Sequence, residues 1–253
     1  MTASAAFIHY QPEENSLANK IIAVTGAGDG IGRAAALGFA RHGATVILLG
    51  RTIKKLEAVY DNIVADKKNA EPAIYPINFE GAVASDYENL ANNFAKEFDR
   101  LDGLLLNAAE LGQRTPLSQY STKVWNAVMQ VNVTSQFLLT QALIPLMEKA
   151  PSASVIFTGS SVGYKGRAFW GAYSVSKAAV ENMMQVFADE LNETTNIRLN
   201  SVNPGATRTK MRANAYPGEE PSKLKAPGEI LGTYYYLMGD DSIGVTGQQF
   251  KAQ

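Results

Sequence analysis

The stretch Thr25-Gly26-Ala27-Gly28-Asp29-Gly30-Ile31-Gly32 decides the fold of this chain. A β-prone run at residues 20–25 leads into it, and the helix-favouring run Arg33-Ala34-Ala35-Ala36-Leu37 follows it. Glycines permit a tight turn and let backbone N–H groups approach a pyrophosphate at the N-terminus of a helix, where the helix dipole favours an anion. A strand, a glycine-rich turn and a helix in this order predict a dinucleotide site. The alternative is a flexible connection that binds nothing.

Short runs rich in Val, Ile and Leu alternate with stretches of helical periodicity along the rest of the chain, as in βαβ units around a parallel sheet. We predict strands at residues 20–25, 45–49, 73–78, 103–107, 154–159, 197–203 and 248–250. We predict helices at residues 31–42, 53–67, 86–98, 121–149, 173–192 and 227–238. Right-handed crossovers place helices on both faces of such a sheet. The sequence therefore predicts an α/β fold, a single doubly wound Rossmann-type domain with a seven-stranded parallel sheet.

Two segments lie outside this alternation. Residues 1–18 are predicted to form a loose N-terminal extension ahead of the domain at residues 19–253, with docking of its apolar side chains on the body as the alternative. Residues 209–226 are rich in Pro and Gly, and we predict a mobile loop there. Such a loop would lie over the carboxyl ends of the strands, where sheets of this kind bind ligands.

Composition excludes several classes of protein. Hydrophobic residues make up 46% of the chain and the net charge is -1, so there is material for a core and no overall field that attracts nucleic acid or a membrane surface. The absence of cysteine and the presence of only two histidines argue against a thiolate nucleophile, a His-based triad and a metal site. No window approaches about eighteen uninterrupted apolar residues, and the N-terminus lacks a basic leader region, so we expect a cytoplasmic protein.

The residues after the second predicted strand bear on the type of dinucleotide. NAD sites commonly carry an acidic residue about 20 residues beyond the glycines. Residues 33–56 contain no Asp or Glu, and Arg51 stands at the strand end with Lys54 and Lys55 beyond it. A guanidinium can bind a 2′-phosphate through two hydrogen bonds whereas a carboxylate repels it, so we predict NADP(H). The alternative is that Arg51 only caps a solvated strand end.

A candidate acid–base pair lies on the helix predicted at residues 173–192. Tyr173 and Lys177 are four residues apart, so their side chains share one helical face. A nearby ammonium lowers the pKa of a phenol from about 10 toward the range useful for acid–base chemistry. Ser160 ends a strand thirteen residues earlier, where its hydroxyl can hold a substrate oxygen beside the phenol. Ser161 is the competing candidate, and a Tyr packed on the sheet with a solvated Lys is the alternative for the pair.

Together these motifs resemble the short-chain dehydrogenase/reductase family, of the single-domain kind. Within it the sequence is most similar to the YciK-like bacterial oxidoreductases. The resemblance runs from Lys20 nearly to the C-terminus and rests on several motifs in a fixed order. These are Thr25 to Gly32, Asn107-Ala108, Asn132 in Val131-Asn132-Val133, Ser160, Tyr173 with Lys177, and Asn203-Pro204-Gly205 with Thr209.

The resemblance implies a role for each matching residue. Tyr173 would donate or accept the proton, Lys177 would bind the nicotinamide ribose and lower the pKa of Tyr173, and Ser160 would orient the carbonyl group. Asn132 would complete a proton relay through a helix-bound water, the alternative being a side-chain hydrogen bond that only ties the helix to a neighbour. The residues expected to contact the cofactor are Gly26, Gly28, Asp29, Gly30, Ile31, Gly32, Arg51, Asn78, Asn107, Ala108, Ala109, Tyr173, Lys177, Pro204, Gly205, Thr207 and Thr209.

The chain departs from the family pattern at three places. Ala109 stands where the family has Gly, so the resemblance implies a different backbone position beside the adenosine ribose. Asn78 stands where the family has Asp, so the adenine contact would be made by an amide. The chain ends in Phe250-Lys251-Ala252-Gln253, without the Gly-Gly pair that often closes the family.

The function implied by the resemblance is an NADP(H)-dependent carbonyl reductase or alcohol dehydrogenase for a small-molecule carbonyl or alcohol. A non-catalytic NADP(H)-binding sensor or scaffold is a second hypothesis, and an isomerase or lyase using the same site is a third. The helices at 121–149 and 173–192 carry more apolar residues than a single stripe facing the sheet requires, which predicts a homodimer or homotetramer. A group of apolar side chains near the site predicts an apolar substrate pocket, the alternative being that they only pack against the catalytic helix. These are Tyr164, Phe169, Trp170, Met211 and Tyr216.

Overall fold

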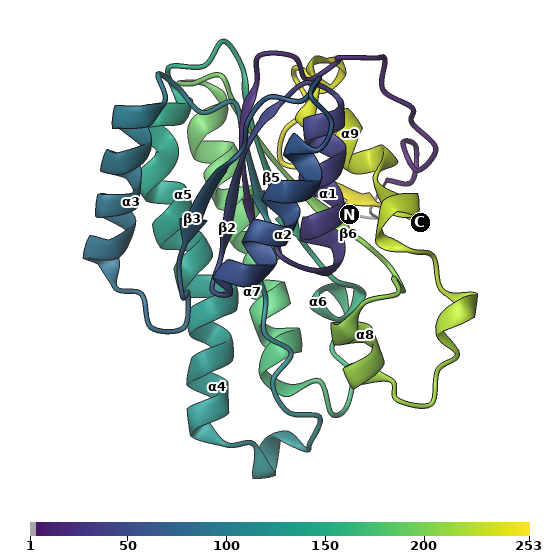
Figure 1. Ribbon diagram of the computed structural model, residues 1–253. Helices are drawn as coiled ribbons and strands as arrows, with labels where there is room; N and C mark the ends of the chain where they lie inside the picture. Colours follow the sequence, from purple (N-terminus) through teal and green to yellow (C-terminus); the bar gives the residue numbers. More distant parts are fainter. Residues whose placement is uncertain (1–3) are drawn as a thin grey trace.

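The computed structural model describes residues 4–253 of the 253-residue chain. Within this range, seven parallel strands form a single sheet in the order β3-β2-β1-β4-β5-β6-β7. Figure 1 shows helices packed beside this sheet. The strands are β1 Ile21–Thr25, β2 Thr45–Gly50, β3 Ala73–Pro76, β4 Gly103–Leu106, β5 Ala153–Thr158, β6 Ile197–Asn203 and β7 Gln249–Lys251. The predicted doubly wound, seven-stranded parallel sheet is confirmed.

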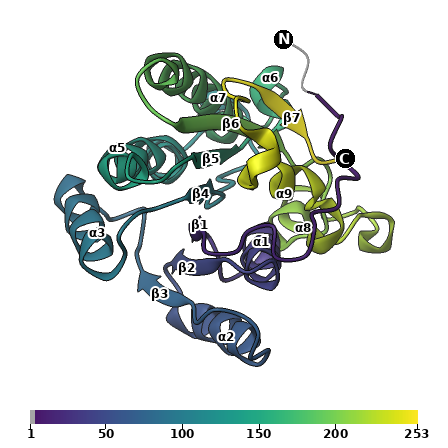
Figure 2. The same cartoon turned by 90° about the horizontal axis from the view of Figure 1, so that it is seen from above.

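Helices cover both faces of the sheet. They include α1 Gly30–Arg41, α2 Ile53–Val64, α3 Ala84–Glu97, α5 Ser135–Met147, α7 Gly171–Asn192 and α9 Gly232–Met238. Helices α1, α2 and α9 pack on one face and α3, α5 and α7 on the other, each over its own cluster of buried apolar side chains (Figure 2). The central strands are therefore buried on both faces, which explains their continuous apolar runs. None of the helices between residues 4 and 253 combines the length and apolar character needed to span a membrane.

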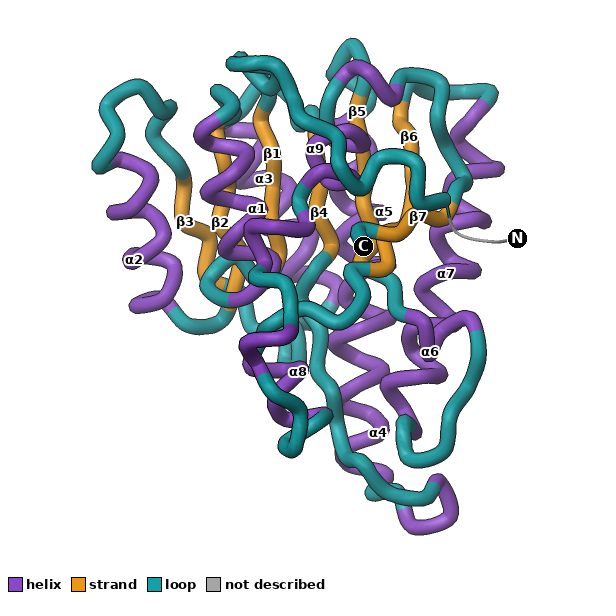
Figure 3. The backbone as a smooth tube through the Cα atoms, turned by 90° about the vertical axis from the view of Figure 1, so that its right-hand side faces the viewer, coloured by secondary structure: helices purple, strands orange, loops and turns teal. Residues whose placement is uncertain are grey.

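The strand order reverses between β1 and β4, where Ala23 pairs with Leu104. The chain after β1 turns to one face and the chain after β4 to the other, so a crevice opens outside their carboxyl ends, the usual ligand position in such sheets. Beyond this edge lie α4 Thr122–Met129, α6 Ser161–Tyr164 and α8 Lys210–Ala215 (Figure 3).

The helix predicted at residues 121–149 is interrupted by a π turn at Gln130–Thr134, between α4 and α5. Asn132, in the middle of this turn, is fully buried, and its side chain bonds to a loop and to α7. A π turn has a wider hydrogen-bonding repeat than the α-helix and often marks a functional site. The pattern of apolar residues did not predict it, because the bonds that hold it come from distant parts of the chain.

The segment at residues 209–226, predicted as a loop, contains the short helix α8. The Thr209 hydroxyl accepts a hydrogen bond from the backbone N–H of Arg212 at 3.1 Å, which caps the helix. The loop-forming residues from Pro217 onward follow this helix and do not interrupt it. Helix α8 thus adds a regular wall over the carboxyl ends of the strands.

The N-terminal segment of residues 4–18 docks on the body of the molecule. Phe7 stacks on Tyr236 of α9, with the ring centroids 3.4 Å apart. Leu17 is buried in the core on the same face of the sheet. Residues 1–3 of the predicted extension lie outside the described residues.

The two described ends of the chain meet at β7. Ser4 forms a parallel bridge with Phe250, its N–H donates to the carbonyl of Gln249 at 2.8 Å, and its carbonyl accepts from the N–H of Lys251 at 2.7 Å. Because β7 is the last strand of the sheet, this pairing covers part of an otherwise open edge.

Helix α9 begins later than the predicted start at residue 227. A 3₁₀ turn at Pro227–Ile230 precedes it, and the α-helix starts only at Gly232. A Cβ atom at Gly232 would lie 2.6 Å from the carbonyl oxygen of Ile8. The docked N-terminal segment therefore passes directly over this break, and only glycine leaves it room.

Candidate active site

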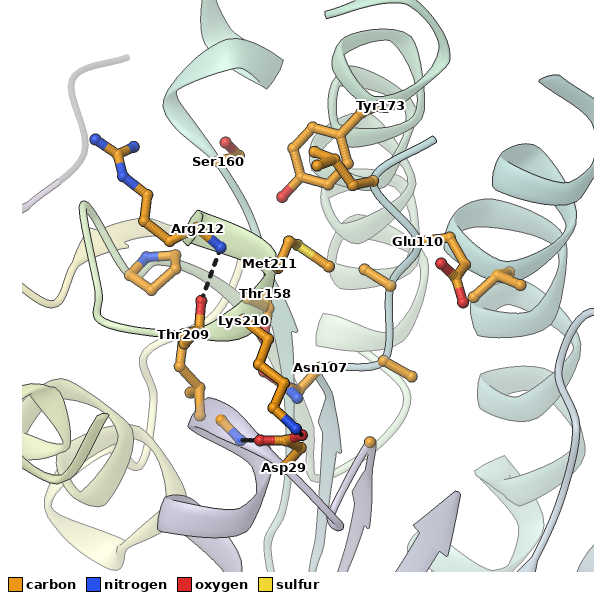
Figure 4. A pocket seen from close by; sticks show the side chains of 18 of the residues that line it. Asp29, Asn107, Glu110, Thr158, Ser160, Tyr173, Thr209, Lys210, Met211 and Arg212 are labelled. Atoms are coloured by element: carbon orange, nitrogen blue, oxygen red, sulfur yellow. Dashed lines mark hydrogen bonds and ion pairs between the residues drawn. The ribbon is translucent and has the colours of Figure 1, made fainter. Parts of the chain in front are cut away.

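A cavity of about 650 Å³ opens at the carboxyl ends of the strands. The loops after β1 to β6 and helix α8 form its walls, and Figure 4 shows it from close by. Of the residues predicted to bind the cofactor or to act in catalysis, all but Gly32 and Asn132 line it. These are Gly26, Gly28, Asp29, Gly30, Ile31, Arg51, Asn78, Asn107, Ala108, Ala109, Ser160, Tyr173, Lys177, Pro204, Gly205, Thr207 and Thr209.

The glycine-rich loop brings the N-terminus of α1 to the wall of the cavity. Gly26 has a φ of +66° and Gly30 a φ of +54°, a left-handed conformation that favours glycine. A Cβ atom at Gly32 would overlap the carbonyl oxygen of Gly26, so α1 packs directly against the loop there. Gly32 thus permits close packing, while Gly28, Gly30 and Ile31 face the cavity.

Asp29 joins the glycine loop to two other walls of the cavity. Its carboxylate caps α1 by accepting a hydrogen bond from the N–H of Gly30 at 2.8 Å. It also pairs with Lys55 at 2.7 Å and with Lys210 of α8 at 3.5 Å (Figure 4). The hydrogen bond from Lys55 is the main reason why the pKa of Asp29 lies below its usual value. This predicted cofactor residue is therefore engaged by two lysines and tethers α8 to the loop.

Arg51 lines the cavity at the end of β2 and is paired within the protein. Its Nη1 atom lies 2.9 Å from Oε1 of Glu110, in the loop after β4. The Arg51 side chain remains 59% exposed, so its guanidinium is open to a further partner. Arg51 thus does more than cap a strand end, because it bridges two walls of the site.

Asn107 ties the ends of β1 and β4 together below the cavity. Its N–H donates to the hydroxyl of Thr25 at 2.8 Å, and its side-chain amide donates to the carbonyl of Thr25 at 3.3 Å. Ala108 and Ala109 follow along the cavity wall, and Asn78 lines the wall formed after β3. Two of the three departures from the family pattern, Asn78 and Ala109, therefore face the cavity.

The loop after β6 forms another wall of the cavity. The Thr207 hydroxyl donates to the carbonyl of Pro204 at 3.0 Å, and Gly205 has a φ of +69°. The side-chain amide of Gln253 donates to the same carbonyl at 2.7 Å and to the Thr207 hydroxyl at 3.2 Å. The last residue of the chain therefore helps to shape this loop.

Tyr173 and Ser160 lie at the same end of the cavity (Figure 4). Tyr173, near the start of α7, is 9% exposed, and Ser160 follows β5 as the N-cap of α6. Burial raises the pKa of Tyr173 to about 12, and a hydrogen bond with Ser160 offsets part of this rise. The expectation of a lowered pKa is therefore wrong for the chain by itself, because burial outweighs the favourable contacts.

Lys177 lies one turn beyond Tyr173 and is also buried. Its Nζ atom donates a hydrogen bond to the carbonyl of Thr158 at 2.6 Å and lies 5.8 Å from the centroid of the Tyr173 ring. Burial lowers the pKa of Lys177 to about 8, and the carboxylate of Glu181 opposes this effect. Lys177 is thus not a solvated surface lysine, and it is mostly protonated at neutral pH.

The side-chain oxygen and nitrogen of Asn132 both form hydrogen bonds within the protein. Its carbonyl oxygen accepts from the N–H of Glu110 at 2.8 Å, and its amide donates to the carbonyl of Glu110 at 3.0 Å and to the hydroxyl of Ser176 at 2.9 Å. These bonds tie the π turn to the loop after β4 and to α7. They agree with the alternative of a structural tie, and the proton-relay role stays a prediction.

The end of the cavity beyond Tyr173 is apolar. Its side chains come from four segments of the chain: Leu111, Val162, Trp170, Met211, Ala215 and Tyr216. The guanidinium carbon of Arg114 lies 4.0 Å from the centroid of the Trp170 ring. Of the residues expected to form an apolar pocket, Phe169 and Tyr164 do not line this cavity.

Among the residues that the sequence analysis did not single out, Glu110, Glu181 and Gln253 act on groups of the site. Glu110 directly follows the run of residues 107–109, and this position beside predicted cofactor contacts could have indicated it. Glu181 lies four residues after Lys177, the same spacing that links Lys177 to Tyr173. Gln253 carried no signal, because its contacts depend on where the chain end folds back.

Comparisons with known proteins agree with this geometry. Residues 20–220 match the model of the short chain dehydrogenase family. The oxidoreductase YciK of Escherichia coli strain K12 is 50% identical over 246 residues, which cover 97% of this chain and 96% of YciK. The structure of a short chain dehydrogenase from Pseudomonas syringae is 51% identical, with a TM-score of 0.94 over 96% of this chain and 98% of that chain. A short chain dehydrogenase from Escherichia coli CFT073, complexed with NADPH, is 50% identical, with a TM-score of 0.92 over 96% of this chain and 100% of that chain. The chain therefore belongs to the short chain dehydrogenase family of oxidoreductases, as its motifs predicted.

Proposed function

We propose that this chain is an NADP(H)-dependent carbonyl reductase or alcohol dehydrogenase in which Tyr173 is the general acid and base. The observation that carries the proposal is that Ser160, Tyr173 and Lys177 line one cavity together with the glycine-rich loop and Arg51. The loop that would hold a cofactor and the proton donor on α7 therefore line one space for a substrate, and such positioning supplies much of the rate enhancement in enzymes.

The residues of the cavity fit NADP(H). Gly26 and Gly30, with positive φ, leave the backbone open to a pyrophosphate at the N-terminus of α1. Arg51 is exposed enough to bond a 2′-phosphate. The Lys177 amine can donate to the hydroxyls of the nicotinamide ribose. The NADPH complex of the relative from Escherichia coli CFT073 supports the same cofactor for this chain.

In the reductive direction, the bound cofactor supplies a hydride to the carbonyl carbon of the substrate. Ser160 donates a hydrogen bond to the carbonyl oxygen, and Tyr173 gives its phenolic proton to that oxygen as the alcohol forms. The Lys177 ammonium stabilises the phenolate that remains. A pKa of about 12 keeps Tyr173 protonated at neutral pH, so its proton is available to the substrate oxygen. In the oxidative direction, the phenolate takes the proton of the alcohol.

The apolar end of the cavity indicates the class of substrate. Trp170, Met211 and Tyr216 surround the space beyond Tyr173, so the group attached to the carbonyl carbon is best accommodated when it is aromatic or aliphatic. We therefore expect aromatic ketones and medium-chain aldehydes to be reduced faster than short polar ones.

The test is NADPH oxidation, followed by absorbance at about 340 nm, with a panel of aldehydes and ketones. The wild type should consume NADPH with at least one member of the panel, and Tyr173→Phe should not. Loss of a hydrogen-bond donor to a developing oxyanion lowers kcat by about 10²- to 10³-fold, so Ser160→Ala should show a loss of this size. Ser161→Ala, the matched control, should keep wild-type turnover.

Two outcomes separate the other functions. Tight NADPH binding without consumption for any carbonyl compound would favour a sensor or scaffold of the same fold. Conversion of a substrate without net NADPH consumption, detected by mass spectrometry of the products, would favour an isomerase or lyase. Normal turnover by Tyr173→Phe would overturn the acid–base assignment whichever substrate is used.

A further inference from the structure

Glu181 is a buried carboxylate one helical turn beyond Lys177. It is 4% exposed, and Tyr173, Lys177 and Glu181 follow one another at a spacing of four, so they share one face of α7. Its Oε2 atom accepts hydrogen bonds from the hydroxyl of Ser201 at 2.6 Å and from the amide of Gln249 at 3.0 Å. The neighbouring strands β6 and β7 thus hold the carboxylate in place.

The other carboxylate oxygen lies against the strand end that carries the site. Oε1 of Glu181 is buried without a hydrogen bond of good geometry among the described residues. A Cβ atom at Gly159 would overlap it, so a larger residue at this position would displace the carboxylate. Gly159 separates Thr158, whose carbonyl holds the Lys177 amine, from Ser160. The carboxylate therefore abuts the segment that presents two groups of the active site.

The charges around Glu181 are few. Among the described residues, the titratable groups that act on it are Lys177 on α7 and the phenol of Tyr164 on α6. The packed strands contribute uncharged partners: Thr158 and Gly159 from β5 and its end, Ser201 from β6 and Gln249 from β7. Burial raises the pKa of Glu181 and lowers that of Lys177, and each charge opposes the shift of the other. The two groups are therefore an electrostatic pair, although no direct salt bridge joins them.

We propose that Glu181 is a positioning residue for the Tyr173/Lys177 pair, whose buried carboxylate keeps the Lys177 ammonium charged and held at the Thr158 carbonyl. A buried lysine without a counter-charge loses its proton easily. Its amine would then neither stabilise the Tyr173 phenolate nor attract the cofactor as a cation. The contribution of Glu181 to catalysis rests on the proposed function, but its pairing with Lys177 can be tested on the protein without any cofactor.

The first test is a double-mutant cycle of thermal unfolding with Lys177→Met, Glu181→Gln and the double variant. Removing the lysine should raise Tm more in the Glu181→Gln background than in the wild type, because there the ammonium is buried without a counter-charge. The control cycle pairs Lys177→Met with Glu190→Gln, the same change at an exposed position of α7, and should be additive. Additive Tm changes in the Glu181 cycle would overturn the proposal. If Glu181→Gln does not fold, the proposal requires that the double variant does.

The second test follows NADPH affinity against pH by the fluorescence of the reduced nicotinamide. In the wild type, affinity should fall as the pH rises through the Lys177 pKa near 8. In Glu181→Gln, this midpoint should lie about one pH unit lower, with affinity about fivefold weaker at pH 8 and equal to the wild type at low pH. Glu190→Gln, which leaves the Glu181 charge and its hydrogen bonds in place, should keep the wild-type midpoint.

A merely structural role would have a different signature. Glu181→Gln would then weaken NADPH binding by the same factor at every pH, and an unchanged midpoint overturns the proposal. If the wild type does not bind NADPH at all, the proposed function fails, and the unfolding cycle alone decides whether Glu181 and Lys177 are paired. Rescue of the midpoint by Glu181→Asp, which restores the charge, is the expected result of the conservative variant.

Discussion

The guanidinium of Arg51 lies 2.9 Å from the carboxylate of Glu110, so the proposed 2′-phosphate ligand is paired within the protein. The two side chains are 59% and 37% exposed, and such surface ion pairs contribute little to stability. An incoming phosphate therefore competes with Glu110 for Arg51 at small cost. The ion pair holds Arg51 beside the glycine loop, and a bound phosphate can replace Glu110 as its partner.

The role of Arg51 predicts a change of cofactor preference. A charge-assisted hydrogen bond contributes about 1.5 to 3 kcal/mol, so Arg51→Ala should weaken NADPH binding about 10- to 150-fold and hardly affect NADH. Adding Gly50→Asp should reverse the preference, because a carboxylate repels the 2′-phosphate and accepts from ribose hydroxyls. Titrations of both cofactors with wild type and variants check this. Equal affinity of the wild type for NADH and NADPH would remove the role of Arg51 and leave the Tyr173 chemistry untouched.

Glu110 should act in the opposite direction. Glu110→Gln removes the competitor of the phosphate, and since an exposed ion pair contributes about 0.2 to 1 kcal/mol, NADPH affinity should increase by about 1.4- to fivefold. NADH affinity should stay unchanged, because that cofactor does not use Arg51. Glu57→Gln, an exposed position on α2, is the matched control. Weaker NADPH binding in Glu110→Gln would show that Glu110 helps to hold the cofactor.

Tyr173 and Lys177 should differ in their effects on binding and turnover. Tyr173→Phe removes one proton and little volume, so turnover should be lost while NADP(H) affinity stays within a few fold of the wild type. Lys177→Ala should damage both, because its amine serves the ribose and the phenol. Steady-state kinetics and NADPH fluorescence titration separate the two effects. Full NADPH affinity in Lys177→Ala would contradict the ribose contact.

Stability should depend on pH through Lys177. Its pKa is lowered to about 8 from the ordinary 10.5, so between these values the unfolded chain binds more protons than the folded chain. This contribution therefore increases stability as the pH rises across the window, and the buried ammonium costs stability below it. The Tm advantage of Lys177→Met over the wild type should be largest at about pH 7 and shrink toward about pH 10. A difference that does not vary with pH would contradict the lowered pKa.

The predicted oligomer has a candidate surface in the structure. Phe137 on α5 is 39% exposed and Val186 on α7 is 48% exposed, and the Phe137 ring stacks on Phe187 with centroids 6.2 Å apart. Light scattering should give two or four times the chain mass of 27.3 kDa. Phe137→Asp with Val186→Asp should give a monomer, whereas Ile243→Asp, at another exposed apolar position, should not. A wild-type monomer at micromolar concentration would contradict the prediction.

The sheet and the placement of Ser160, Tyr173 and Lys177 at one cavity could be predicted because they depend on local patterns. The glycine-rich turn between a strand and a helix indicated the doubly wound fold, and a spacing of four placed Tyr173 and Lys177 on one face. The spacing of Ser160 from Tyr173 and from the two nearby glycines favours it over Ser161, and the hydrogen bond between Ser160 and Tyr173 that lowers the Tyr173 pKa agrees with this choice. Short-range periodicity can thus predict the relative positions of side chains that belong to the same helix or strand.

The remaining features depend on contacts between distant segments. The π turn at Gln130–Thr134 exists together with the bonds of Asn132 to Glu110, which no periodicity reveals. The raised pKa of Tyr173 follows from burial, a property of the assembled fold. The late start of α9 follows from the N-terminal segment that crosses Gly232. Tertiary packing decides each of these, and it overrides local preference.

Because Ser4 hydrogen-bonds to Gln249 and Lys251, the described ends of the polypeptide lie next to each other. A circularly permuted chain, with a short Gly/Ser linker between the old termini, would keep every strand pairing of the sheet. The exposed residues 66–68, between α2 and β3, offer a place to open the new termini. In such a permutant β3 would be the first strand synthesised and β2 the last, while the same loops would surround the cavity.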